Sequence, residues 1–150
     1  CQMNAESLAF RDRSFDIIIC WSIIHHTDVQ RTINEIFRVL RDDGKVIFIE
    51  PLGHNFIINL FRKLTPHKRT PDERPLTEYD MNILRCKFPK MKSEGYYLIS
   101  LISFVWYYIF RSKKMMLKTI KMIDKIDRIV LKTIPVMNKY CWYSIIVCEK

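Results

Sequence analysis

Two short apolar runs separated by one amphipathic helical pattern constrain the fold of this chain most strongly. Residues 15–21 and 45–50 are rich in β-branched residues and lack polar alternation, which predicts strands buried on both faces. Between them, residues 29–40 carry an apolar stripe at helical spacing, with Thr27 or Asp28 as the candidate N-cap. This order predicts a βαβ unit with two parallel strands and a right-handed crossover.

The remainder of the chain alternates helical patterns with loops and ends in a strand. Gly44 is expected to end the first helix as a C-cap glycine, and Pro51 to close the second strand. Three prolines make residues 65–77 a loop. Three further helices are expected: over 55–64, from Thr77 to about Cys86 with Asp80 in a capping box, and over 115–134 before Pro135. Two further strands are expected, over 91–98 with a turn at Gly95 and over 141–148.

Five cysteines show neither a pairing pattern nor a metal-binding pattern: Cys1, Cys20, Cys86, Cys141 and Cys148. An odd, scattered set fits neither a disulfide framework nor a zinc site, so we expect reduced thiols and a cytoplasmic protein. The chain starts with Cys, and no signal peptide precedes its first folded segment. Either a segment has been processed away, or the chain is a piece of a longer protein.

Positive charge is concentrated in the second half of the chain. Residues 1–75 hold 11 Lys/Arg and 10 Asp/Glu, whereas residues 76–150 hold 14 and 6, so the second half carries +8 of the net +9. The asymmetry indicates an anionic partner surface, with a solvated basic face as the alternative. We do not expect nucleic acid, because no recognised binding motif accompanies the charge.

Residues 96–134 combine an uncharged stretch with a basic amphipathic helix. The 15 residues of 96–110 carry no charge but are fewer than the ~20 that a spanning helix needs. Residues 111–132 hold eight Lys/Arg against two Asp, which is typical of a helix that lies on anionic lipid. We expect a lid-like insertion that touches a membrane surface, with a buried core helix as the alternative. Its apolar stripe is Met116, Ile120, Ile123, Ile126, Val130 and Ile134.

Histidines follow both predicted strands at the edge where a parallel sheet binds ligands. The segments 20–26 and 50–54 carry His25, His26 and His54 together with one acidic residue. Histidine titrates near neutral pH, so this edge can host proton transfer, although loop bracing is the alternative role. No metal is expected, because adjacent histidines rarely bind one ion and no third ligand is evident.

An ordered series of motifs resembles one enzyme family. Residues 4–16 read N-A-E-S-L-A-F-R-D-R-S-F-D, followed by His25-His26, then by E-I-F-R-V-L at 35–40 and by Gly44. The series is similar to class I S-adenosylmethionine-dependent methyltransferases of the small-molecule, type 11-like branch. It covers about a third of the chain, and only the combination is specific.

The resemblance implies a cofactor, S-adenosyl-L-methionine, and places residues around it. Asn4, Ala5 and Glu6 would form the adenine end of the pocket, with Ala5 acting through its backbone N–H. Cys20 and Trp21 would lie beside the methionine part. His25 and His26 would face the acceptor, and either is the candidate general base where the acceptor must lose a proton.

The chain also departs from the family pattern. Asn4 stands where the family has an acidic residue that contacts the adenine amine, although an amide oxygen can still accept a hydrogen bond. Ala9 replaces a proline, and Arg41-Asp42-Asp43 replaces a lysine–proline–glycine turn. The family's glycine-rich loop and its ribose-binding acid belong before residue 4. We therefore expect the C-terminal portion of a methyltransferase, with a G-x-G loop within about 60–80 residues upstream of Cys1 and an inactive isolated piece.

The expected fold class is α/β, a partial Rossmann-like methyltransferase fold with a mostly parallel sheet, flanking helices and an apolar and basic helical insertion before the last strand. We divide one domain into a cofactor-side core (1–51), a region of loop and short helices (52–95), a helical insertion or lid (96–134) and a final strand (141–148). The acceptor is expected to be small and lipid-like or amphiphilic. We also expect peripheral attachment to the inner face of a membrane through 111–132. Rival interpretations are a nicotinamide-dependent oxidoreductase and a non-catalytic membrane-associated module.

Overall fold

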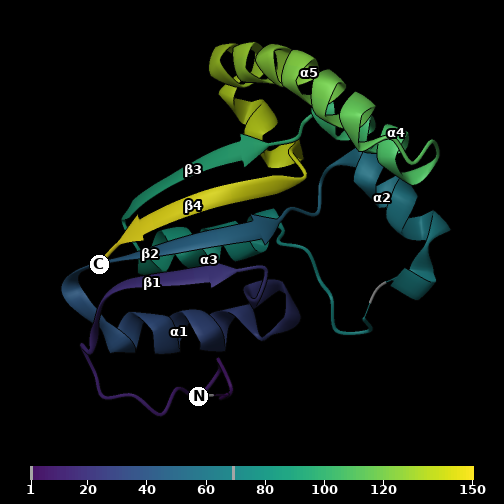
Figure 1. The fold of residues 1–150 in the computed structure, drawn as a ribbon. Coiled ribbons are helices and arrows are strands. Elements are labelled where there is room, and N and C mark those ends of the chain that lie inside the picture. The colour runs from purple at the N-terminus through teal and green to yellow at the C-terminus, as the bar shows by residue number, and fades with distance from the viewer. Residues whose placement is uncertain (1, 69) are drawn as a thin grey trace.

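A four-stranded mixed sheet organises the computed structural model, which describes residues 2–68 and 70–150 (Figure 1). Strand β1 (Phe15–Trp21) pairs in parallel with β2 (Leu40–Pro51), as the βαβ pattern predicted. The aligned pairs include Ile19 with Ile47. The parallel half of the sheet thus comes from the first third of the chain.

The other half of the sheet is antiparallel. Strand β4 (Tyr143–Glu149) lies between β2 and β3 (Lys90–Tyr96) and runs antiparallel to both, which gives the order β1-β2-β4-β3. The α/β class is confirmed. The expectation of a mostly parallel sheet is wrong for the described residues, because two of their three strand pairings are antiparallel.

Helices and short 3-10 segments connect the strands. They are η1 (Ile24–His26), α1 (Val29–Val39), α2 (Phe56–Leu64), η2 (Pro66–Lys68), α3 (Glu78–Lys87), η3 (Ser100–Ser103), α4 (Phe104–Tyr108), α5 (Lys113–Thr133) and η4 (Pro135–Tyr140). Figure 1 shows α5 on the β3 side of the sheet, away from α1. Helical segments therefore occupy most of residues 100–140, ahead of the last strand.

Local caps explain where three of the helices begin. Of the two candidates before α1, Asp28 is the N-cap, and its carboxylate accepts from the Arg31 N–H at 3.0 Å. Asn55 caps α2. The Asp80 carboxylate accepts from the Thr77 N–H at 2.8 Å, which confirms the capping box of α3. Each cap satisfies a backbone donor that the first helical turn leaves free.

Gly44 does not end the first helix. Helix α1 stops at Val39, and Leu40 already pairs with Phe15, so Gly44 lies inside β2 within a break in the strand register. A Cβ at Gly44 would stand 2.7 Å from Leu40 Cγ. The glycine is therefore explained by the close approach of the Leu40 side chain rather than by a left-handed C-cap.

Gly95 makes no turn either. It lies within β3, opposite Ser144, and β3 ends at Tyr96 rather than at Leu98 as expected. A Cβ at Gly95 would stand 2.5 Å from Cys141 Sγ, so only glycine leaves room for this buried thiol. As at Gly44, the reason for the glycine is a tertiary contact that sequence pattern does not reveal.

One face of the sheet is covered by α1 and α3. Val46 and Phe48 of β2, together with Ile146 and Cys148 of β4, are buried against these helices. The helical side of this core consists of Ile24, Val29, Ile33, Ile36, Leu76, Met81, Leu84 and Phe88. The described chain therefore completes its hydrophobic core on this side of the sheet.

The opposite face of β1 is not covered by the described chain. Ile17, Ile19 and Trp21, which alternate along β1, are 61%, 65% and 74% exposed. Their cross-strand neighbours on this face, Ile47 and Ile49 of β2, are half-buried. Parallel strands are usually covered on both faces, so these exposed apolar side chains are unusual for such a strand.

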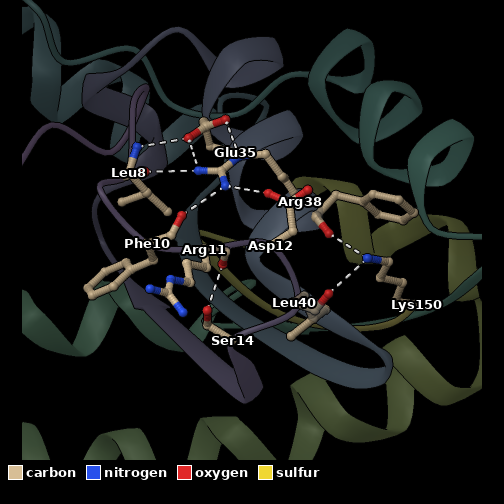
Figure 2. A network of polar contacts seen from close by, with 10 residues as sticks. Leu8, Phe10, Arg11, Asp12, Ser14, Glu35, Arg38, Leu40 and Lys150 are labelled. Carbon is tan, nitrogen blue, oxygen red and sulfur yellow. Dashed lines mark hydrogen bonds and ion pairs between the residues drawn. The ribbon is translucent and has the colours of Figure 1, made fainter.

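A network of polar contacts attaches residues 8–12 to α1 (Figure 2). Glu35 accepts from the Leu8 N–H at 2.8 Å and from Arg38 at 2.8 Å. Arg38 also donates to the carbonyls of Leu8 and Phe10 and to Asp12. The hydrogen bond from Arg38, followed by that from the Leu8 N–H, lowers the pKa of Glu35 to about 2. The segment before β1 is thus held by charge-assisted hydrogen bonds.

Helix α5 is attached through a buried carboxylate. Asp127 is 1% exposed and accepts from the Leu98 N–H at 3.0 Å, from the Ile99 and Ser100 N–H groups, and from Ser100 Oγ at 2.7 Å. These donors lie just before η3 and at its first residue. The predicted apolar stripe is only partly inward, because Ile126 and Ile134 are exposed. Several apolar residues of α5 thus remain exposed to solvent: Met115, Leu117, Met122, Ile126 and Ile129.

Four cysteines are free thiols: Cys20, Cys86, Cys141 and Cys148. Cys1 lies outside the described residues. Burial raises the pKa of Cys20, Cys141 and Cys148 to about 12 each, with Glu50 adding to the effect at Cys20 and Asp127 at Cys141. These three thiols are therefore neutral at physiological pH.

Candidate functional site

The carboxyl ends of β1 and β2 form the edge that the sequence singled out. Trp21 pairs with Ile49, and the next residue, Ser22, donates its N–H to the Ile49 carbonyl at 2.9 Å. Ser22 has φ 51°, a left-handed conformation that a non-glycine residue seldom adopts. Such backbone strain is concentrated at functional sites. The chain turns sharply here and enters η1.

Glu50 anchors η1 to the end of β2. Its side chain is fully buried, and Oε1 accepts from the Ile23 N–H at 2.9 Å and the Ile24 N–H at 3.1 Å. Its other oxygen, Oε2, lies 2.6 Å from Nδ1 of His25. His25 is itself only 6% exposed. The sequence placed Glu50 at this edge but gave no indication that it contacts His25.

His26 has a different environment. Its Nδ1 lies 2.8 Å from Oδ2 of Asp72, in the loop between η2 and α3, and both side chains are partly exposed. A backbone hydrogen bond and the contact with His26 hold the pKa of Asp72 below its ordinary value. The rings of His25 and His26 are 4.1 Å apart, centre to centre. Each histidine thus has its own carboxylate, one buried and one exposed.

A cavity of about 290 Å³ lies beside the two histidines. His25 and His26 line it together with Ser22, whose Oγ is 3.3 Å from the Tyr143 hydroxyl. His54, expected at the same edge, lines other cavities and not this one. The structure therefore gathers His25 and His26 but not the third histidine.

An apolar cavity adjoins the histidine cavity. It has a volume of about 210 Å³ and lies between α2, η3 and α4. Ile58, Phe61 and Trp142 line both cavities, so the two share a wall. The remaining lining is Ile57, Leu101, Ile102, Phe104, Val105, Tyr108 and Ile109. A polar compartment thus lies next to one that offers only apolar and aromatic side chains.

The segment Asn4–Glu6 lies next to the start of α1. Glu6 Oε1 accepts from the Asp28 N–H at 2.9 Å, two residues beyond His26. Asn4 Oδ1 accepts from the Glu6 N–H at 2.9 Å, which engages the amide oxygen inside its own turn. No hydrogen bond is found at the Ala5 N–H among the described residues.

Cys20 and Trp21 point to opposite faces of the sheet. Cys20 is packed in the core between the sheet and α1, so only its backbone can face a ligand at the edge. Trp21 lies on the uncovered face and is 74% exposed. Within the part of the chain that the structure describes, no group of three or more potential ligands could hold a metal ion.

Three residues of this site could not be predicted from the sequence: Asp72, Tyr143 and the left-handed Ser22. Asp72 contacts His26 from 46 residues away, and Tyr143 contacts Ser22 from 121 residues away. The left-handed Ser22 carries no sequence signal, since glycine would be the expected residue there. Only the acidic residue at the end of the second strand was detectable, through its position at the carboxyl edge.

Comparison with known sequences identifies the first part of the chain. Residues 1–48 match the family model described as a methyltransferase domain. An uncharacterised methyltransferase of Bacillus subtilis, YcgJ, is 39% identical over 72 residues, which cover 43% of this chain and 28% of that protein. The aligned part therefore spans less than a third of this relative.

Solved structures match over nearly the whole chain. A Thermotoga maritima methyltransferase described as a possible histamine N-methyltransferase aligns with TM-score 0.62 and 15% identity, covering 99% of this chain and 62% of that one. Haemonchus contortus phosphoethanolamine N-methyltransferase 2, in complex with phosphomonomethylethanolamine and S-adenosylhomocysteine, aligns with TM-score 0.57 and 15% identity, covering 98% and 36%. At these identities the likeness concerns the fold.

Proposed function

This chain belongs, through residues 1–48, to the class I S-adenosylmethionine-dependent methyltransferases, and from that premise we propose that the complete protein methylates a small acceptor. The match to the family model carries the proposal, because the matched segment includes β1, η1, α1 and most of β2. These elements carry His25 to the carboxyl edge of the sheet, and Glu50 lies two residues beyond the matched segment. The nature of the acceptor is a finer proposal.

The described residues suit one end of S-adenosylmethionine. We expect the Ala5 N–H and the Asn4 side chain, whose amide oxygen already accepts from the Glu6 N–H, to face the adenine, and the exposed Trp21 ring offers an apolar surface at the strand end. Only three glycines occur in the chain, at positions 44, 53 and 95, and none belongs to a glycine-rich loop. We propose that the part of the pocket for the amino-acid group comes from residues of the complete protein beyond these 150.

The same proposal accounts for the uncovered face of β1. The aligned region covers 62% of the Thermotoga maritima chain and 36% of the Haemonchus contortus chain, so both of those chains contain further structure. Additional strand and helix packed against Ile17, Ile19 and Trp21 would bury these side chains on the second face, as is usual for parallel strands. We propose that the 150-residue chain alone does not bind the methyl donor tightly.

His25 is the preferred general base of the two candidates. The bound donor supplies an electrophilic methyl group on a sulfonium, so the protein chiefly has to position the acceptor. His25 is buried at the wall of the histidine cavity, whereas His26 is partly exposed. A base is needed only where the acceptor carries a proton that must leave.

The adjoining cavities favour an amphiphilic acceptor. The histidine cavity would take a polar head that carries the nucleophile, and the 210 Å³ apolar cavity would take an alkyl or ring tail. Ile58, Phe61 and Trp142 would contact both parts. Methyl transfer to octylphenol, octylamine and octanoate, compared with phenol, methylamine and acetate, tests this. Transfer to the short compounds that equals transfer to the octyl compounds would contradict it.

We also propose that α5 lies on an anionic lipid surface. None of the described helices is long and apolar enough to span a bilayer. Met122, Ile126 and Ile129 are nevertheless exposed at helical spacing on this basic helix. The proposal predicts that the complete protein co-sediments with anionic vesicles at low salt and less at high salt. Absence of binding to anionic vesicles at low salt would contradict it.

Donor binding tests the main proposal directly. Titration calorimetry of the complete protein with S-adenosylhomocysteine should detect binding, and Trp21→Ala should weaken it because the ring lies at the strand end. Asp43→Ala is the control, since Asp43 is exposed near the start of β2, at the other end of the strand from this edge. Equal effects of the two substitutions would mean that the pocket lies elsewhere.

A further inference from the structure

We propose that Glu50 is a positioning residue that holds His25 in the tautomer protonated at Nδ1, so that Nε2 accepts the proton of the methyl acceptor. The inference rests on the proposed function and deepens it. It starts from the contrast between two neighbouring histidines, each beside a carboxylate, of which only one pair is buried.

The contacts of Glu50 fix the direction of its hydrogen bond with His25. Two backbone N–H groups already donate to Oε1, at 2.9 and 3.1 Å. An ionised carboxylate only accepts, so the 2.6 Å contact at Oε2 requires the proton on Nδ1 of His25. The imidazole in its neutral form then has its lone pair on Nε2.

The remaining nitrogen of His25 is the one that can meet an acceptor. His25 lines the 290 Å³ cavity, and among residues 2–68 and 70–150 no hydrogen bond engages its Nε2. Because Glu50 also binds the Ile23 and Ile24 N–H groups, one side chain sets both the backbone of η1 and the tautomer of His25.

The step that follows is balanced without a further reactant. The nucleophilic atom of the acceptor forms its bond to the methyl carbon and gives its proton to Nε2. The carbon–sulfur bond of the donor breaks, and its electron pair stays on sulfur, which becomes a neutral thioether. The imidazolium is then stabilised by the Glu50 carboxylate at 2.6 Å.

The Glu50→Gln substitution separates positioning from folding. The glutamine carbonyl can still accept from the Ile23 and Ile24 N–H groups, but its NH₂ group then faces Nδ1. This arrangement favours the tautomer with the proton on Nε2, which cannot act as a base. Asp72→Asn makes the equivalent change beside His26 and serves as the matched comparison.

The tautomer is read by nitrogen-15 NMR of histidine-labelled complete protein. We expect the proton on Nδ1 of His25 in the wild type and on Nε2 in Glu50→Gln. With octylphenol or octylamine, the octyl acceptors that must lose a proton, kcat should fall about 100-fold or more in Glu50→Gln, with KM and donor affinity little changed, and less in Asp72→Asn.

Three results would overturn the inference. One is a wild-type spectrum with the proton of His25 on Nε2, which needs no activity to be observed. Another is an unchanged kcat in Glu50→Gln, and the third is an equal or larger loss in Asp72→Asn. Failure of the wild-type complete protein to bind S-adenosylhomocysteine would instead contradict the proposed function, and the spectrum would still decide the tautomer.

Discussion

The two faces of the sheet differ sharply in how they are covered. On one face, Val46 and Ile146 are completely buried beneath α1 and α3. On the other, Ile19 and Trp21 of the neighbouring strand are 65% and 74% exposed. The residue types are similar on both faces, so composition alone does not distinguish them. The difference lies in whether the described chain supplies a helix to pack against them.

The sequence of β1 is that of a strand covered on both faces, whereas the described chain covers only one of its faces. Residues 15–21 read as a strand buried on both faces, and the structure buries Cys20 but leaves its neighbour Trp21 exposed. A strand that is apolar on both sides needs two layers of cover.

Thiol reactivity should show the largest contrast. Cys20 and Cys148 point into the covered face, and burial raises their pKa to about 12 from an ordinary 9.0. At pH 8 this lowers their thiolate fraction about 1000-fold. Cys86 is exposed. Iodoacetamide followed by peptide mass mapping should therefore modify Cys86 before Cys20 and Cys148. Modification of Cys20 at the rate of Cys86 would show that the covered face is open.

A matched pair of isoleucines measures the same contrast as stability. Ile146→Ala, on the covered face, should reduce the free energy of unfolding by about 3 kcal/mol. Ile19→Ala, on the open face, should cost less than about 1 kcal/mol, because the side chain is already largely in water. Urea unfolding of the 150-residue chain gives both values. In the complete protein the Ile19 value should rise, and similar losses from both substitutions in the 150-residue chain would contradict the comparison.

The network behind α1 should make a smaller, pH-dependent contribution. Arg38 and the Leu8 N–H lower the pKa of Glu35 from 4.5 to about 2. A lowered folded-state pKa stabilises the protein above the unfolded value, so this contribution is complete above about pH 4.5 and is lost as pH falls towards 2.

Glu35→Gln should therefore reduce the free energy of unfolding by about 1 kcal/mol at pH 7, because its side chain is 22% exposed and solvent weakens the ion pair. The difference from wild type should shrink as the pH is lowered towards 2. Unfolding curves at a series of pH values measure it. A constant difference across that range would contradict the role given to the Glu35 carboxylate.

Sequence patterns correctly predicted the features that depend on residues close together in the chain. The N-cap at Asp28, the capping box at Thr77 and Asp80, and the parallel pairing of β1 with β2 are all confirmed. Each depends on residues within one helix turn or one βαβ unit. The two glycine predictions are wrong because Gly44 and Gly95 make room for Leu40 and Cys141, which are contacts of the folded state.

Long-range pairing explains what the sequence could not predict. The antiparallel half of the sheet joins residues 90–96 to residues 143–149, and no pattern in either segment specifies its partner. At the site, His25 and His26 were predicted to share an edge with an acidic residue, and they do. The distances to Glu50 and Asp72 depend on η1 and on the loop before α3, whose conformations the sequence did not predict.

Hydrogen exchange with mass spectrometry tests the central claim most directly, namely that Asn4–Glu6 and the carboxyl ends of β1 and β2 hold the methyl donor. The complete protein is compared with and without S-adenosylhomocysteine. We predict slower exchange in peptides that cover residues 4–8 and 20–26, and little change in α5, residues 113–133. Unchanged exchange in both edge peptides, in a protein that calorimetry shows to bind the ligand, would contradict the account.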